Sequence, residues 1–181
     1  MRRLSILLTA LVAAPLAAAT PDHAAEGQAI AAAFGAELKA ALQSAMVEGG
    51  PLAAISVCHD DAPRIALEAA AKSGAEAGRT SLQLRNPANA PDAHEQAVLE
   101  AFAAELAAGA TPPLSRVDTL PDGRVRFMST IMVQPQCAAC HGADLAPPVA
   151  EALDRLYPDD QARGYQPGDL RGAFTITWPA E

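Results

Sequence analysis

The chain contains the stretch Cys137-Ala138-Ala139-Cys140-His141, which has the form C-x-x-C-H. This spacing is the attachment signature of c-type haem. Two thiols must reach the two vinyl groups on one edge of the porphyrin, and two intervening residues let the chain curl so that both sulfurs face that edge. The histidine that follows then lies under the ring with a nitrogen directed at iron. We therefore predict one covalent haem c per chain, attached through Cys137 and Cys140, with His141 as an iron ligand.

Two other kinds of site use a C-x-x-C pair, and the surrounding sequence favours neither. A thiol–disulfide redox motif gives no role to the histidine, and no βαβ pattern surrounds this pair. A zinc site needs two more ligands at matching spacing, and none follow in the remaining forty residues.

The N-terminus predicts export from the cytoplasm. Arg2 and Arg3 precede an apolar stretch from Leu4 to Leu16, and Ala17-Ala18-Ala19 offers a cleavage site of small residues. This is the layout of a secretory signal peptide. The apolar stretch is short for a membrane span, although an uncleaved anchor is the alternative. Because bacteria join haem to C-x-x-C-H outside the cytoplasmic membrane, the export signal and the motif support each other, and we predict a periplasmic protein.

Length and charge bound the rest of the chain. Residues 1–19 are predicted as the signal peptide, and residues 20–181 as a single haem domain. The whole chain carries a formal charge of −8, and without Arg2 and Arg3 it has 11 basic and 21 acidic residues, about −10. This balance disfavours nucleic acid and anionic membrane surfaces and permits docking to a basic redox partner protein. Aromatic residues make up only 4% of the chain, so a haem would supply apolar volume that the side chains lack.

Apolar spacing and turn residues predict an α+β domain, with helices first and an antiparallel sheet after them. Helices are predicted over residues 24–48, where Gly49-Gly50-Pro51 follows, from Asp60 or Asp61 to about Gly74, over 92–108 and over 147–156. Strands are predicted over residues 78–85, 114–120, 124–133 and 172–178, with the C-x-x-C-H motif between the last two.

A third cysteine, Cys58, remains once the motif has taken the other two. An exported protein with an odd cysteine leaves one thiol to explain: it is either a small buried hydrophobe or chemically used. Five side chains are able to bind iron opposite His141, and the residues alone leave the choice open: Cys58, His59, His94, Met128 and Met132. The ordinary alternatives are histidines on the surface and methionines in the core of a β-hairpin that residues 114–120 and 124–133 are predicted to form.

Three arginines, Arg79, Arg85 and Arg171, lie in turn-rich or strand-end segments. We predict them as partners of the haem propionates, with ordinary surface positions as the alternative.

Several stretches together resemble a family of exported bacterial c-type haem domains with a PAS-like fold, catalogued as a domain of unknown function. They occur in the family's order and span almost all of residues 20–181. The matching stretches are residues 54–58, 62–66, 78–81, 84–92, 137–142, 157–160, 164–165 and 168–173.

The resemblance implies a PAS-like antiparallel sheet with N-terminal helices. It also implies His141 as the proximal ligand and Cys58 as the sixth ligand of the haem. His59 is a departure from the family, because it offers a competing ligand one residue away. Family members occur alone and fused to bacterial signalling modules.

Two functions follow from these predictions. One is a redox- or gas-responsive haem module, whose displaceable sixth ligand gives way to CO or NO. The alternative is a periplasmic electron-transfer cytochrome c with two fixed ligands. An enzyme is not expected, because no acid–base pair or nucleophile stands beside the motif.

Overall fold

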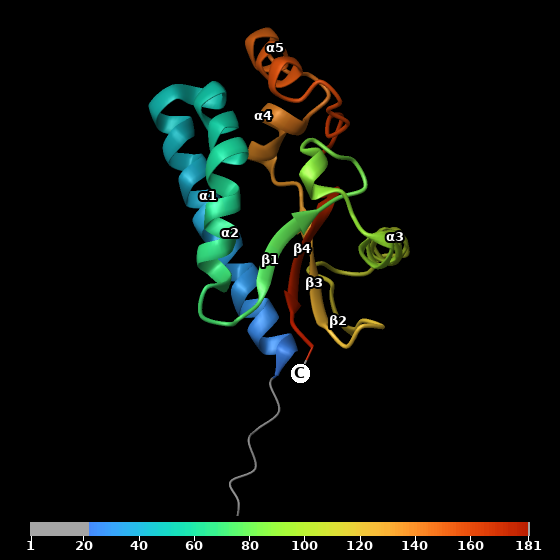
Figure 1. Ribbon diagram of the computed structural model, residues 1–181. Helices are drawn as coiled ribbons and strands as arrows, with labels where there is room; N and C mark the ends of the chain where they lie inside the picture. Colours follow the sequence, from blue (N-terminus) through green and yellow to red (C-terminus); the bar gives the residue numbers. More distant parts are fainter. Residues whose placement is uncertain (1–21, 181) are drawn as a thin grey trace, which may run out of the picture.

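The computed structural model describes residues 22–180. The predicted signal peptide, residues 1–19, lies outside this range. In the described part of the chain, no helix is both long and apolar enough to cross a membrane. The architecture is α+β, with a long N-terminal helix and a four-stranded antiparallel sheet (Figure 1).

The long helix α1 (His23–Ser56) contains the predicted helix and continues beyond it. Gly50 has φ +67° and ψ −161°, so the helix kinks there, and Pro51 begins a second helical segment. Proline suits this position because its missing N–H has no partner in a first turn. A π-helical turn, η1 (Val57–Asp61), then leads into α2 (Ala62–Ala70), which runs back beside α1 (Figure 1).

The sheet has the strand order β1-β4-β3-β2, and all neighbours are antiparallel. Its strands are β1 (Glu76–Thr80), β2 (Ser115–Thr119), β3 (Val125–Met132) and β4 (Leu170–Trp178). The predicted hairpin is confirmed as β2 and β3. The first predicted strand is five residues shorter at its C-terminal end, because Ser81 leaves the ladder and donates its hydroxyl to the Arg171 carbonyl at 2.7 Å. Since β1 lies between α2 and α3, the predicted order of helices first and sheet afterwards holds only in part.

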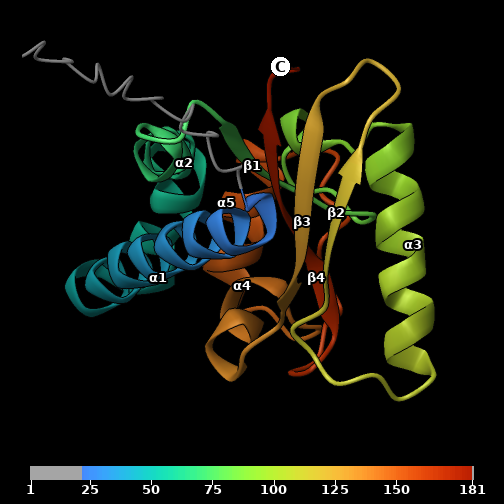
Figure 2. The same cartoon turned by 90° about the horizontal axis from the view of Figure 1, so that it is seen from below.

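Helices cover both faces of the sheet (Figure 2). On one face α1 packs so closely that a Cβ on Gly27 would lie 2.4 Å from Cγ of Phe127. The buried side chains of this face are Ile30, Ala31, Ala70, Phe127, Ile176 and Trp178. On the other face lies α3 (Ala93–Ala107), which begins with a capping box of Asp92 and Glu95. Its buried cluster contains Val98, Leu99, Phe102, Met128 and Ala173.

The remaining helical segments gather at one end of the sheet, near the kinked end of α1 (Figure 1). They are η2 (Pro87–Asn89), η3 (Pro135–Cys137), α4 (Ala138–His141) and α5 (Pro147–Leu156). The predicted helix over 147–156 is confirmed as α5. It packs through Val149 and Leu153 against Ile55 of α1, so the segment before η1 and the segment after the motif form one cluster.

Candidate functional site

The C-x-x-C-H motif forms one helical turn. Cys137 ends η3, and Ala138–His141 form α4. Residues three apart lie on the same face of a helix, so this turn presents the two thiols on one side. Gly142 then turns the chain away, and a Cβ there would lie 2.6 Å from the Ala138 carbonyl oxygen. Both thiols are free and half-buried, as attachment to a cofactor requires.

His141 is held in the form that binds metal. Its Nδ1 lies 2.8 Å from the carbonyl oxygen of Ala162. A carbonyl only accepts, so Nδ1 carries the proton and Nε2 keeps a free lone pair. Burial, with the charges of Arg85 and Arg171 adding to it, lowers the pKa of His141 to about 3. The imidazole is therefore neutral at physiological pH.

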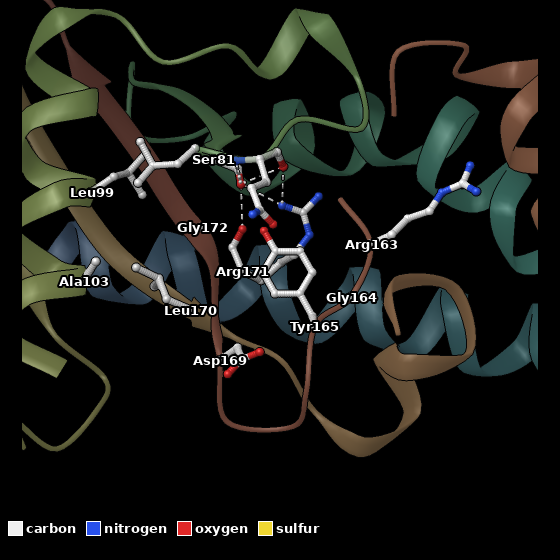
Figure 3. Close-up of a pocket in the computed structure, with 12 residues that line it drawn as sticks. Ser81, Leu99, Ala103, Arg163, Gly164, Tyr165, Asp169, Leu170, Arg171 and Gly172 are labelled. Atoms are coloured by element: carbon white, nitrogen blue, oxygen red, sulfur yellow. Dashed lines mark hydrogen bonds between the residues drawn. The ribbon is translucent and has the colours of Figure 1, made fainter. Parts of the chain in front are cut away.

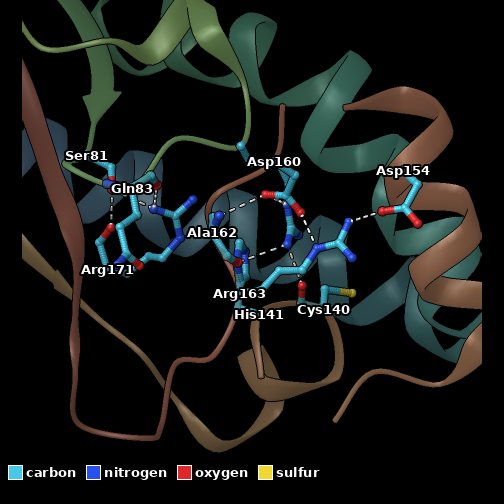
Figure 4. Close-up of polar contacts among 10 residues, drawn as sticks. Ser81, Gln83, Cys140, His141, Asp154, Asp160, Ala162, Arg163 and Arg171 are labelled. Atoms are coloured by element: carbon cyan, nitrogen blue, oxygen red, sulfur yellow. Dashed lines mark hydrogen bonds and ion pairs between the residues drawn. The ribbon is translucent and has the colours of Figure 1, made fainter. Parts of the chain in front are cut away.

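A buried ion pair, which we call the clamp, holds the backbone of this turn; Figure 4 shows Asp160, one of its two members, together with Cys140, His141 and Ala162. The clamp consists of Arg85 and Asp160, whose Nε–Oδ1 distance is 3.1 Å and whose side chains are 9% and 1% exposed. Nη2 of Arg85 donates to the carbonyls of Cys140 at 2.5 Å and Ala162 at 3.1 Å. The same arginine thus binds the motif and the carbonyl that orients His141.

Residues 160–165, which we call the strap, run along the motif. The amide of Ala162 donates to Asp160 at 2.9 Å, which ties the strap to the clamp. The amides of Gly164 and Tyr165 donate to the carbonyls of Gly142 at 3.1 Å and His141 at 2.9 Å. Backbone hydrogen bonds therefore join the strap to the motif.

The three predicted arginines have different surroundings. Arg85 belongs to the clamp, so its Nε and Nη2 are committed to protein acceptors and its predicted propionate contact stays untested. Arg79 pairs with Phe174 across β1 and β4, on the α1 face, with its guanidinium 5.6 Å from the centre of the Phe34 ring. Burial lowers the pKa of Arg79, and within residues 22–180 no carboxylate forms an ion pair with it. Arg171, in β4, lines a cavity together with Leu99 and Ala103 of α3.

The five candidate sixth ligands are separated by the fold. Met128 is 1% exposed and packs against α3. His94 places its Nε2 3.2 Å from Asp118 Oδ2, also on the α3 side. Met132 lines a cavity with Pro112, Pro113 and Pro135. Met128, in β3, and His94, in α3, therefore both lie on the α3 side of the sheet.

Cys58 and His59 lie in η1, near the motif. Cys140 packs against the cluster of Ile55 and Tyr157. Burial raises the pKa of Tyr157, and the proximity of Cys58 raises it further, as it also does for Cys140. The His59 ring lies 5.6 Å from that of Tyr157, but its Nδ1 is 2.6 Å from Asp60 Oδ1 and its side chain is 45% exposed. Cys58 is thus the less solvated of the two candidates.

Three features of the site were not found from the sequence: the clamp, the strap and the π-helical turn. π-helical turns are rare and often occur at functional sites. The residues of η1, VCHDD, carry no pattern that distinguishes such a turn from an α-helix. In the part of the chain that the structure describes, no three His, Cys, Asp or Glu side chains gather to hold a bare metal ion.

The fold and the site define a class of protein: an α+β domain that holds a C-x-x-C-H turn with a neutral, metal-competent histidine. The chain belongs to the Tll0287-like family, whose sequence model matches residues 16–179. The family resemblance predicted from the sequence is thereby confirmed.

A solved structure agrees with this assignment. It is described as the crystal structure of the cyanobacterial heme-protein Tll0287, and it is 32% identical to this chain. The match covers 68% of this chain and 71% of that one, with a TM-score of 0.56. No curated protein matches the chain.

Proposed function

We propose that this protein is an exported c-type haem-binding protein, with one haem joined to Cys137 and Cys140. The observation that carries the proposal is the hydrogen bond from His141 Nδ1 to Ala162, because it leaves Nε2 free beside two free thiols. The solved relative is described as a heme-protein, which supports the same cofactor. The predicted signal peptide supports a periplasmic location.

The donor set of this chain fits such a cofactor. His141 is neutral and oriented, Cys58 offers a soft anionic ligand, and the buried guanidinium of Arg79 has no carboxylate partner within residues 22–180. A haem propionate supplies the negative charge that Arg79 lacks. We therefore assign Arg79 to a propionate and Arg85 to holding the motif, in a fold of PAS-like type.

We further propose that the site responds to redox state or to small gases. Bound haem supplies one-electron chemistry and an iron with an exchangeable position. With haem bound, Cys58 as a thiolate would favour the ferric state, because an anion stabilises the more positive ion. It would bind reduced iron more weakly and would then give way to CO or NO. Electron transfer to a periplasmic partner is the second candidate function, and the acidic charge of the chain suits a basic partner.

Covalent attachment is tested by extraction with acidified organic solvent. We expect the exported protein to keep its haem and to have the mass of the chain plus one haem. The double variant Cys137→Ser/Cys140→Ser should release haem freely, because no thioether bonds form. Cys58→Ser is the matched control and should keep the covalent haem. Free extraction of haem from the unaltered protein would show that the central proposal is wrong.

The redox- or gas-responsive role is tested by a spectroelectrochemical titration with and without CO. We expect a midpoint potential well below that of His/Met cytochromes, low in the range of about 0.8 V that axial ligands command. CO should bind the reduced protein and replace Cys58 there, because a thiolate binds ferrous iron more weakly; ferric haem does not bind CO whatever its sixth ligand. A positive midpoint, with reduced iron that keeps both of its protein ligands under CO, would favour the electron carrier instead.

A further inference from the structure

A cavity of about 380 Å³ lies on the α3 side of the sheet, where Leu99 and Ala103 line it (Figure 3). Its apolar wall is formed by Leu82, Leu99, Ala103 and Leu170. Its polar wall is formed by Ser81, Gln83, Arg163, Tyr165, Asp169 and Arg171. Apolar and polar side chains thus share the lining, and the volume lies in the usual range of small-molecule sites, about 300–1,000 Å³.

Arg171 is the charged group of this cavity that has room for a ligand. Its Nη1 donates to Ser81 Oγ at 2.7 Å and to the Gln83 carbonyl at 3.2 Å. No carboxylate within residues 22–180 forms an ion pair with it. The other charges are already used, since Arg163 binds Asp160 and Asp154, and Asp169 Oδ2 accepts from the Gln166 amide at 2.7 Å.

The positive charge on Arg171 is also poorly compensated. Burial lowers its pKa, and repulsion from Arg85 and Arg79 lowers it further. Arg171 is half-buried, and removing part of a guanidinium from water is costly without an anion. A carboxylate matches its planar pair of donors. The cavity therefore matches a ligand that has a negative group beside an apolar body.

The same cavity touches the segment that holds His141. Tyr165 lines it, lies under the Arg171 guanidinium at 5.5 Å and donates its amide to the His141 carbonyl at 2.9 Å. The rings of Tyr165 and His141 lie 6.3 Å apart, edge to face. A ligand on Arg171 thus contacts the strap that fixes the motif.

We propose that this cavity binds a small organic carboxylate through Arg171 and that its occupation is felt at His141. The binding half needs only the cavity, whereas the coupling half rests on the proposed haem function. A haem propionate is the other source of a carboxylate. We favour a free acid because Arg171 lines a cavity with Leu99 and Ala103 of α3, whereas Arg79 pairs with Phe174 on the α1 face.

The test is calorimetric titration of the exported, haem-loaded protein with benzoate, and with benzamide as its uncharged counterpart. We expect saturable binding of benzoate and binding of benzamide weaker by roughly ten- to hundredfold, because a hydrogen-bonded charge pair is lost. Optical spectra recorded in the same titration should show a benzoate-dependent shift of the haem bands.

Two variants locate the site. Arg171→Gln removes the charge, and Ala103→Phe fills the cavity from α3 without touching the motif; each should weaken benzoate binding by roughly tenfold or more. Arg155→Gln, an exposed arginine of α5, is the control and should bind benzoate as the unaltered protein does.

The outcomes separate this proposal from the haem assignment. The proposal is overturned, even if haem is covalently attached, if benzoate does not bind or if both site variants bind it as tightly as the unaltered protein does. Binding to haem-free protein alone shows that a propionate occupies Arg171 and overturns the free-acid proposal. Binding without a spectral shift overturns the coupling to His141. If benzoate binds but the haem extracts freely, carboxylate binding in the cavity is supported and the covalent haem assignment is wrong.

Discussion

Asp160→Ala is expected to lower the free energy of unfolding by about 3–5 kcal/mol, the usual cost of leaving a buried charge without its partner. Asp160 is 1% exposed, and its carboxylate accepts from Arg85, Arg163 and the Ala162 amide. Without it, Arg85 keeps a buried positive charge, and the strap loses its tie to the clamp. Denaturant unfolding followed by circular dichroism measures the change.

The effect of Asp160→Ala on the free energy of unfolding should also depend on pH. Burial by itself raises the pKa of Asp160, but hydrogen bonds from Arg163, Arg85 and the Ala162 amide outweigh it, so the pKa lies below its ordinary value. A carboxyl whose pKa is lower in the folded state stabilises the fold above its unfolded pKa of about 3.9 and loses this effect as pH falls through the folded pKa. The difference between the unaltered protein and Asp160→Ala should therefore be constant above about pH 5 and shrink below about pH 4.

Asp154→Ala is the matched control, because Asp154 binds the same Arg163 but is 67% exposed. Exposed ion pairs contribute about 0–1 kcal/mol, so its effect should be small. Equal losses in the two variants would mean that the clamp does not stabilise the chain.

Cys58→Ser is expected to remove the thiolate-to-iron charge-transfer bands of the oxidised protein and to raise its midpoint potential by on the order of 100 mV or more. A serine hydroxyl is a weak, neutral ligand, so the preference for ferric iron is lost. Optical and electron spin resonance spectra of the oxidised protein report the ligand, and a redox titration reports the potential. The haem should stay attached, because Cys137 and Cys140 are unchanged.

His59→Gln is the control for this experiment, since His59 is the adjacent candidate ligand in η1 and its side chain is half-exposed. Its spectra should match those of the unaltered protein. If Cys58→Ser leaves the spectra unchanged while His59→Gln alters them, the sixth ligand is His59 and the expected low potential falls with the assignment.

Elements with local causes could be predicted from the sequence. The capping box of Asp92 and Glu95 begins α3, and Pro121-Asp122-Gly123 joins the strands of the hairpin. The C-x-x-C-H motif carries its own chemistry within five residues. The kink at Gly50 was predicted as an end of the helix, because the sequence does not reveal that Ile55, beyond it, packs against α5.

The sequence by itself determined which chemistry this chain carries: two thiols separated by two residues, a histidine and a third cysteine, in an α+β chain of the Tll0287-like family. Only the tertiary structure decided how these groups are held and which neighbours they have. Arg85 and Asp160 are 75 residues apart, and Arg171 and Ser81 are 90 apart. The physical reason is that capping and motif spacing act over a few residues, whereas the orientation of His141 and the faces of Arg79, Met128 and Arg171 depend on contacts between distant segments, which form only when the sheet is assembled.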